Sequence, residues 1–278
     1  MFAGRNVLIA TKHKKELVIS PILEKELAIT CFVSEQFDTD TLGTFSGEIE
    51  RKHDALTTLR NKCIHAANAS KSDLVIASEG SFGAHPSIFF AHANQELVML
   101  KDFKNDLEII AKEISLETNF NGEKISNETD LLTFAEKVNF PSHALILKSD
   151  EVNFSTIFKG IQSENELLEK FYELNNKNGF VYVETDMRAM FNPTRMKVIE
   201  KATWQLIEKI KSLCPTCQTP GFDIVDAVSG LPCELCKNPT RSTLYYLYQC
   251  KKCNHSSKKM FPRGITYEEP TYCDTCNP

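Results

Sequence analysis

The stretch CPTCQTPGFDIVDAVSGLPCELC, residues 214–236, begins and ends with a Cys-x-x-Cys pair, and two more pairs follow in CKKC (250–253) and CDTC (273–276). Two thiolates on such a turn supply half of a tetrahedral metal site, so four pairs predict two sites of four cysteines each. The predicted ligands are Cys214, Cys217, Cys233, Cys236, Cys250, Cys253, Cys273 and Cys276. This ligand set favours two zinc ions, with iron as the alternative.

The sequence leaves open which pairs share a metal ion. Sequential pairing joins 214–217 to 233–236 and 250–253 to 273–276, with a strand-like segment and a proline inside each stretch. Nested pairing joins 233–236 to 250–253 across the β-rich run TLYYLYQ, as in a zinc ribbon. We expect the sequential pairing, and we expect residues 213–278 to form a small zinc-ribbon-like module.

The zinc module has two candidate roles, which are structural support and contact with nucleic acid or a protein partner. A structural zinc ion lets a small module fold without a large core. The basic cluster Lys251, Lys252, Lys258, Lys259 and His255 keeps a nucleic-acid contact open. The whole chain has 37 acidic and 32 basic residues, which argues against a strongly basic nucleic-acid binder. We favour structural support or an interaction surface.

The composition of the 278 residues is typical of a globular protein, with 42% hydrophobic and 25% charged residues. No apolar run reaches the length that a membrane-spanning helix needs. The N-terminal residues MFAGRNVLIATKHKKEL lack a cleavage pattern, so they favour a first strand over a signal peptide. We therefore expect a cytoplasmic protein without a membrane partner, whose clustered cysteines bind metal instead of forming disulfides.

Strand-like and helix-like segments alternate before the cysteines, which predicts an α/β domain over residues 1–212 with a mixed sheet flanked by helices. Apolar runs predict strands at 6–10, 28–33, 73–80, 142–148, 155–161 and 180–187, a hairpin at 87–102, and one strand or a strand pair at 107–120. Helical spacing predicts helices at 14–27, interrupted near Pro21, and at 47–69, 127–138, 163–174 and 192–213.

Two polar segments follow predicted strands, where α/β enzymes place their sites. In ATKHKKE (10–16), Thr11, His13 and Lys15 precede a helix whose first N–H groups favour phosphate. In VIASEGSFGAHP (75–86), Glu79 ends an apolar strand and a loop of small residues follows, beginning with Gly80 and Ser81. A carboxylate at that place can hold Mg²⁺ or activate a water molecule. The alternatives are a solvated basic turn and an exposed acid.

A third polar segment is VYVETDMRAMFNPTR, residues 181–195. Alternation along a strand predicts that Glu184, Asp186 and Arg188 lie on one face. Arg195 is expected in the first turn of the following helix, where anions are favoured. Two acids, two arginines and a helix N-terminus suit a metal–phosphate site. An ion-paired strand end that anchors the helix is an equally weighted alternative.

The order of a strand with ATKHKKE, then DALTTLRNKCIHAA (54–67), then DLVIASEG (73–80) resembles the inosine/xanthosine triphosphate pyrophosphatase superfamily. Those enzymes hydrolyse non-standard purine nucleoside triphosphates with Mg²⁺. The resemblance covers about residues 5–100 and implies phosphate or substrate contacts for Thr11, Lys15, Arg60, Asn61, Lys62, Glu79, Gly80 and Ser81. Lys12 and His13 stand in place of the usual asparagine, and Ser81 replaces a second glycine.

The whole layout, with ETDMRA, NPTRM and terminal Cys-x-x-Cys pairs, resembles an uncharacterised bacterial family. We expect a Mg²⁺-dependent hydrolase of a nucleotide or another phosphorylated small molecule, similar to a nucleoside triphosphate pyrophosphatase. Its predicted catalytic residues are Glu79, Lys15 and Asp186. Its predicted substrate-binding residues are Thr11, His13, Arg60, Asn61, Lys62, Gly80, Ser81, Glu184, Arg188 and Arg195. The alternative is a non-catalytic zinc protein that contacts nucleic acid or a protein partner.

Overall fold

The structure, a computed structural model, describes residues 1–34, 43, 51–88 and 90–278. The chain forms two compact units, Met1–Ile207 and Glu208–Pro278. Helix α5 (Pro193–Lys211) runs through the boundary, and the boundary predicted at residue 212 falls just after this helix. None of the helices in the described ranges is both long and apolar enough to cross a membrane.

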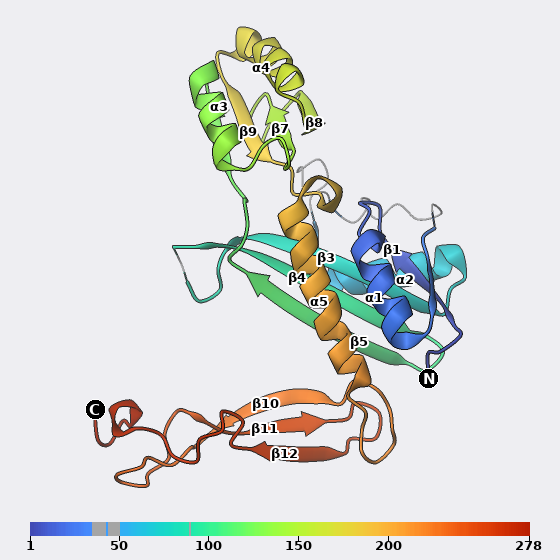
Figure 1. The fold of residues 1–278 in the computed structure, drawn as a ribbon, viewed down its shortest axis with the longest axis vertical. Coiled ribbons are helices and arrows are strands. Elements are labelled where there is room, and N and C mark those ends of the chain that lie inside the picture. Colours follow the sequence, from blue (N-terminus) through green and yellow to red (C-terminus); the bar gives the residue numbers. More distant parts are fainter. Residues whose placement is uncertain (35–42, 44–50, 89) are drawn as a thin grey trace. The chain divides into compact units, whose positions relative to one another are not determined.

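The first unit contains the predicted mixed sheet, with five strands in the order β2-β1-β3-β4-β5 (Figure 1). The strands are β1 (Asn6–Ala10), β2 (Thr30–Phe32), β3 (Leu74–Ala84), β4 (His92–Asp102) and β5 (Leu107–Ser115). The β1 strand runs parallel to β2 and β3, whereas β3, β4 and β5 pair antiparallel. This arrangement confirms the α/β class, because parallel strands need crossover connections such as helices.

Helices cover both faces of the five-stranded sheet. Successive strand residues point to opposite faces, and α2 (Ala55–Ser70) packs on alternate positions, namely Leu8, Ala10, Val75 and Ala77. The intervening residues, such as Ile9 and Ile76, are equally buried. They point to the face on which α1 (Glu16–Leu27) lies, opposite α2 (Figure 1). Burial on both faces explains why these strands read as continuous apolar runs.

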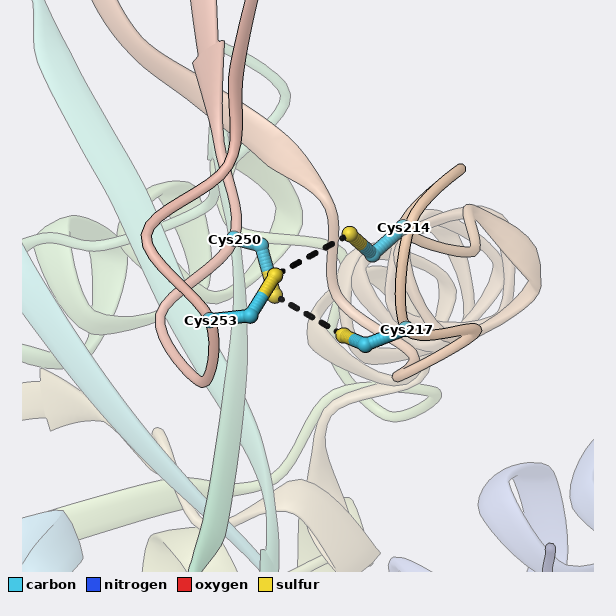
Figure 2. A group of neighbouring side chains, drawn as sticks. All are labelled: Cys214, Cys217, Cys250 and Cys253. Carbon is cyan, nitrogen blue, oxygen red and sulfur yellow. Dashed lines mark hydrogen bonds between the residues drawn. The ribbon is translucent and has the colours of Figure 1, made fainter.

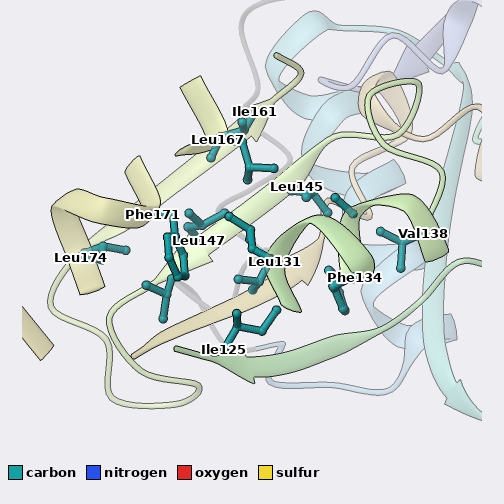
Figure 3. Close-up of a cluster of buried hydrophobic side chains, with 13 residues drawn as sticks. Ile125, Leu131, Phe134, Val138, Leu145, Leu147, Ile161, Leu167, Phe171 and Leu174 are labelled. Carbon is teal, nitrogen blue, oxygen red and sulfur yellow. The ribbon is translucent and has the colours of Figure 1, made fainter. Parts of the chain in front are cut away.

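A second sheet, which the sequence did not separate from the first, has four strands in the order β6-β9-β7-β8. These are β6 (Gly122–Ile125), β7 (Leu145–Lys148), β8 (Ile157–Ile161) and β9 (Val181–Thr185), and all their pairings are antiparallel. Helices α3 (Glu128–Lys137) and α4 (Glu164–Asn178) cover one face. Figure 3 shows the core that results, with Leu131 and Phe171 packed against Leu147.

Side-chain caps begin the helices α4 and α5. The Ser163 hydroxyl accepts the backbone N–H of Glu166 at the start of α4, and Asn192 Oδ1 accepts that of Arg195 at 2.9 Å at the start of α5. The interruption predicted near Pro21 is wrong, since α1 is continuous through this residue. Buried Ile19 and Leu23 anchor α1 on both sides of the proline and offset the hydrogen bond that it cannot make.

Two further predictions are corrected. Residues 92–102 form one strand and not half of an internal hairpin, because the partner of β4 is the longer β3, which continues to Ala84. Residues 107–115 form the single strand β5. The helix predicted from residue 47 begins at Ala55, where Asp54 caps it, and residues 47–50 lie outside the described residues.

The second unit is built on a three-stranded antiparallel sheet in the order β10-β11-β12. The strands are β10 (Asp223–Ser229), β11 (Thr243–Gln249) and β12 (Ser256–Met260). No residue of these three strands is buried. This unit therefore lacks a hydrophobic core of the kind that supports the first unit.

Candidate functional site

The eight predicted ligand cysteines form two groups of four, and within each group all sulfur atoms lie within 4.8 Å of one another. One group is Cys214, Cys217, Cys250 and Cys253 (Figure 2), and the other is Cys233, Cys236, Cys273 and Cys276. Sulfur atoms of neighbouring knuckles are 3.6 to 3.8 Å apart. Four sulfurs around Zn²⁺ at about 2.3 Å would be about 3.8 Å apart, so each group could hold one ion of this size.

The pairing of the knuckles is interleaved, which corrects the sequential pairing that we expected and also differs from the nested one. Antiparallel strands explain it. Asp223, at the start of β10, pairs with Gln249 at the end of β11, which brings 214–217 and 250–253 to one end of the sheet. The strand β10 then carries the chain across the sheet, so 233–236 lies at the other end. There Cys233 bridges to Glu268, near the fourth knuckle.

The four knuckles share one backbone pattern. The N–H four residues after the first cysteine donates to the carbonyl of that cysteine in every knuckle, at 2.8 to 3.0 Å. The donors in the first three knuckles, Gln218, Lys237 and Asn254, adopt left-handed φ values of 58, 63 and 58°. This tight turn directs the two thiolates of each knuckle toward one point, where they could share a metal ion.

The candidate site of the first unit surrounds Glu79, where β3 extends beyond β1. The last residue of β1, Ala10, pairs with Ala77, so β3 residues from Ser78 onward have no β1 partner. Glu79 points to the α2 face, as do Val75 and Ala77. It is 5% exposed, and it accepts hydrogen bonds from Lys62 Nζ at 2.5 Å and from Arg51 Nη1 at 3.1 Å.

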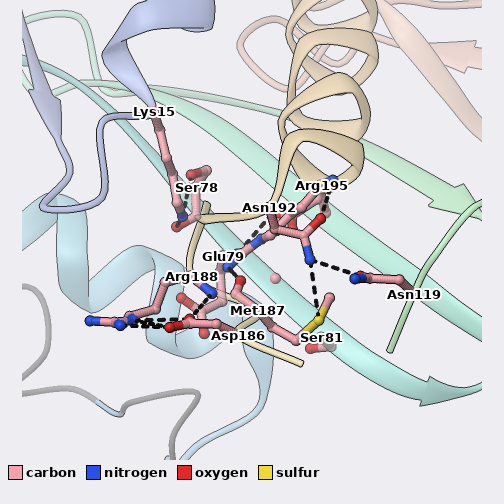
Figure 4. Close-up of polar contacts among 12 residues, drawn as sticks. Lys15, Ser78, Glu79, Ser81, Asn119, Asp186, Met187, Arg188, Asn192 and Arg195 are labelled. Carbon is pink, nitrogen blue, oxygen red and sulfur yellow. Dashed lines mark hydrogen bonds and ion pairs between the residues drawn. The ribbon is translucent and has the colours of Figure 1, made fainter. Parts of the chain in front are cut away.

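Ser78 and Gly80, which flank Glu79, face the opposite side of the sheet. Two further cations lie on that side. Lys15 Nζ donates to Ser78 Oγ at 2.9 Å. Arg195, from the first turn of α5, donates from Nε to Glu96 Oε1 at 2.7 Å and also to the carbonyl of Met187. The Arg195 and Glu96 side chains are both 0% exposed. Figure 4 shows Lys15, which immediately precedes α1, and Arg195 of α5 approaching this strand.

Gly80 is required by this arrangement. A Cβ atom at Gly80 would overlap Arg195 Nη2 and would lie 2.6 Å from Glu96 Oε1. Both partners belong to a fully buried ion pair, so they have little room to move. The glycine after Glu79 thus allows the Arg195–Glu96 pair to reach the strand that carries the candidate site.

The pKa shifts follow from this concentration of charge. Burial, with a further contribution from Arg195, lowers the pKa of Lys15 to about 7. Burial alone would raise the pKa of Glu79, but Lys62, Lys15 and Arg51 outweigh that effect and lower it. Glu79 is therefore ionised at neutral pH, and Lys15 changes its charge near neutrality.

A pocket of about 320 Å³ opens beside Glu79. Its polar wall consists of Arg51, Glu79 and Ser81, and Arg51 Nη1 also contacts Gly80 O and Ser81 Oγ at 3.2 and 3.0 Å. The rest of its lining is formed by Gly43, Gly80, Phe82, Phe120 and Met187. The Phe82 and Phe120 rings stack on each other with centroids 5.8 Å apart, which makes one wall aromatic.

The structure brings several of the predicted residues to this place and leaves others elsewhere. Lys15, Lys62, Glu79, Gly80, Ser81 and Arg195 meet around β3. Arg60 is exposed on α2, where it pairs with Glu108 of β5 at 2.7 Å. The Thr11 hydroxyl accepts the backbone N–H of His13 in the turn after β1. Of the predicted residues, only Glu79, Gly80 and Ser81 line the pocket itself, while Lys15, Lys62 and Arg195 lie behind its wall and Thr11, His13 and Asn61 lie outside it.

The third predicted segment belongs to the second sheet. Glu184 pairs with Lys148 of β7 at 2.7 Å, and burial raises its pKa despite this partner. The strand ends at Thr185, so Asp186 does not continue its alternation. Asp186 is fully buried and is held by Arg188 at 2.6 Å. These contacts match the alternative of an ion-paired strand end, while the adjacent Met187 reaches the pocket.

Sequence reasoning missed Arg51, Glu96 and the aromatic wall. Glu96 had a usable signal, because it is an acid next to the apolar run LVML and lies opposite Gly80 in the β3–β4 register. Arg51 had none, since its approach to Glu79 depends on tertiary packing.

Comparison with known proteins gives a family without an assigned activity. The model of the family described as "Domain of unknown function (DUF6671)" matches residues 62–278, which contain Lys62, Glu79, Arg195 and all eight ligand cysteines. No curated protein matches the chain. The crystal structure of protein VC0702 from Vibrio cholerae aligns with 72% of this chain and 92% of its own, at 6% identity and a TM-score of 0.29.

Proposed function

The chain belongs to the DUF6671 family, and we propose that its Met1–Ile207 unit binds and hydrolyses a phosphorylated ligand of the nucleotide class beside Glu79. The observation that carries this proposal is an excess of positive charge around one buried strand. On the face of β3 that meets α2, the two cations Lys62 and Arg51 bind the single carboxylate of Glu79, and Lys15 lies across the strand at Ser78. A phosphate group would offset the positive charge that remains beside Glu79.

The shape of the pocket suits a ligand with a charged end and a planar end. Arg51 and Ser81 form a donor-rich wall, and Arg51 is one-third exposed, so it can contact a ligand from solvent. Phe82 and Phe120 offer a flat apolar wall within the same 320 Å³ volume. A nucleotide combines these two properties, since its phosphates seek cations and its base stacks on aromatic rings.

We propose that phosphate exchanges partners with Glu79. In the free protein Lys62 and Arg51 both bind the Glu79 carboxylate. When they turn to a phosphate, the carboxylate is released to accept a proton from a water molecule that attacks phosphorus. The new P–O bond forms as the phosphoanhydride bond breaks, and the leaving phosphate departs with the bonding electron pair. The cations stabilise the negative charge that develops on the phosphoryl oxygens.

Magnesium does not fit these residues as a resident ion. Both Glu79 oxygens already accept from cations, and Glu96 is bound by the fully buried Arg195. A hard divalent cation needs carboxylate oxygens that such ion pairs do not occupy. Mg²⁺ therefore enters the proposal as part of a metal–nucleotide substrate, where it neutralises phosphate charge.

For the two groups of four cysteines we propose zinc with a structural role. Reduced thiolates are needed to hold it, so the proposal also places the protein in the cytoplasm.

Binding is expected with a panel of nucleoside mono-, di- and triphosphates in the presence of Mg²⁺, and hydrolysis with the di- and triphosphates, which carry a phosphoanhydride bond. Lys62→Met should weaken ligand binding by about tenfold or more, because Lys62 is a cation that the phosphate recruits. Glu79→Gln should abolish turnover while retaining binding. Titration calorimetry and phosphate or pyrophosphate release measure the two effects.

The matched control is Arg60→Met, which removes a cation from the same helix at a surface ion pair with Glu108. It should change neither binding nor turnover. The proposal fails if no nucleotide of the panel binds, or if Arg60→Met and Lys62→Met act alike at equal thermal stability.

Ligand binding should weaken as the pH rises from about 6.5 to 8.5. Lys15 has its pKa lowered to about 7, so it is protonated and attracts phosphate below that pH and is neutral above it. The loss of one positive charge near the phosphate should weaken ligand binding about tenfold. The affinity of Lys15→Met for the ligand should not change with pH over this interval. The ligand's own phosphate has a second pKa of about 6 and is already mostly ionised there, so it adds little pH dependence. A wild-type slope that survives in Lys15→Met would contradict this role.

A further inference from the structure

The register of the sheet in the second unit defines its two faces, because cross-strand partners share a face. Tyr246 pairs with Ala227 of β10 and Lys259 of β12, and Tyr248 pairs with Ile224 and Ser257. We call this set the Tyr246 face. On the opposite face, Tyr245 pairs with Val228 and Met260, and Leu247 pairs with Asp226 and Lys258. We call that set the Tyr245 face.

The hairpin that carries these faces is cationic. Residues 243–260 contain Lys251, Lys252, Lys258 and Lys259 and no aspartate or glutamate. All four lysines are exposed. A zinc ion bound by four thiolates has a total charge of about −2. Two of those thiolates belong to this hairpin, so about −1 is added to its four lysine charges and the hairpin keeps a net charge of about +3.

The two faces differ in the charge that β10 adds. To the Tyr246 face β10 contributes the uncharged Ala227 and Ile224, both exposed. To the Tyr245 face it contributes Asp226, opposite Leu247. The Tyr246 face therefore presents lysine without a neighbouring acid from the sheet, which suits a polyanion.

Aromatic rings on the Tyr246 face are spaced for stacking. Tyr246 and Tyr248 lie two residues apart on one strand, a separation of about 6.8 Å, and both are partly exposed. The Phe222 ring packs on Tyr248 with centroids 5.6 Å apart and on His255 at 5.9 Å, which extends the aromatic row. Aromatic rows flanked by lysines bind unpaired bases and their phosphates.

We propose that the Tyr246 face binds single-stranded nucleic acid. Bases stack on Tyr246 and on the Tyr248–Phe222 pair, while Lys259 and the knuckle residues Lys251 and Lys252 contact phosphates. This activity is separate from the pocket beside Glu79, and it uses the zinc sites as the support that holds the hairpin.

The zinc-loaded full chain should bind fluorescein-labelled oligothymidine and oligouridine of about 12 nucleotides. Fluorescence anisotropy should show affinity falling steeply between about 50 and 200 mM salt, and a duplex of the same length should bind more weakly because its bases are already stacked. The DNA and RNA arms decide which of the two the face prefers. If neither oligonucleotide binds, the proposal is overturned. That result is expected if the surface binds a protein partner instead.

Neighbouring residues on opposite faces supply matched variants. Tyr246→Ala should weaken binding about tenfold, whereas Tyr245→Ala should not. Lys259→Ala should weaken binding severalfold and reduce the salt slope by about 0.7, whereas Lys258→Ala should leave both unchanged. Each variant is compared only at full zinc content, which reports folding of the unit.

A last variant separates this face from the pocket of the first unit. Arg51→Ala should leave oligonucleotide binding unchanged even where it abolishes binding of a mononucleotide. Equal losses within either matched pair, or loss of oligonucleotide binding in Arg51→Ala, would show that the Tyr246 face is not the binding surface.

Discussion

Removal of metal is expected to unfold the Glu208–Pro278 unit and to leave Met1–Ile207 folded. Strands β10, β11 and β12 contain no buried residue, whereas the buried residues of this unit include Cys214, Cys233, Cys250 and Cys273. Metal ions bound by these cysteines would thus take the place of a core. Structural zinc in small modules contributes about 10–16 kcal/mol per site, far more than these exposed strands can supply.

The interleaved pairing predicts that the two metal sites act together. The segment between Cys233 and Cys253 belongs to both metal-closed loops, 214–253 and 233–276. Cys236→Ser should therefore lower occupancy at both sites, even though its sulfur belongs to one.

Trypsin reports this unfolding directly, because Lys251, Lys252, Lys258 and Lys259 lie in a hairpin whose backbone the protease can bind only after the strands separate. A chelator or Cys236→Ser should accelerate cleavage there by orders of magnitude. Cys31→Ser, which removes a thiol outside both groups, is the control and should leave cleavage and zinc content unchanged. Unchanged protection of the hairpin in zinc-free protein would contradict this account.

Arg195→Met is expected to be the most destabilising single substitution of the candidate site. It would leave the Glu96 carboxylate buried without its cation, at 0% exposure. Breaking a buried pair by removing one partner costs about 3–5 kcal/mol. For a unit of this size the loss corresponds to a fall of about 10 °C in melting temperature.

A double variant distinguishes the ion pair from simple packing. Arg195→Met combined with Glu96→Leu removes both charges and should recover much of the lost stability, whereas packing loss alone would make the double variant worse. Arg60→Met, at a half-exposed surface pair, should cost no more than about 1 kcal/mol. Equal effects of Arg195→Met and Arg60→Met on thermal unfolding would contradict the importance of the buried pair.

Local signals in the sequence predicted elements and ligand types well. Caps such as Ser163 and Asn192 act on the backbone within three residues, so they can be read without the fold. The same holds for the cysteine knuckles, whose hydrogen bonds span four residues. Glu79 at the end of a buried strand was also readable, because the apolar run marks the strand and the acid interrupts it.

Features that depend on strand pairing were not readable. The metal partners of each knuckle follow from the antiparallel register of β10 and β11. The separation of strands β1 to β9 into two sheets depends on which strands pair over long distances in sequence. Arg51 reaches the candidate site through tertiary packing alone, and the Asp186–Arg188 pair lies at the end of the other sheet.

The order of the cysteines also determines when a growing chain can capture its metals. With sequential pairing, a nascent chain would complete its first site once Cys236 had left the ribosome. In the interleaved arrangement four thiolates are already exposed at that stage while neither site is complete. The first site must wait for Cys253 and the second for Cys276, so these thiolates depend on a reducing environment throughout the synthesis of the hairpin between them.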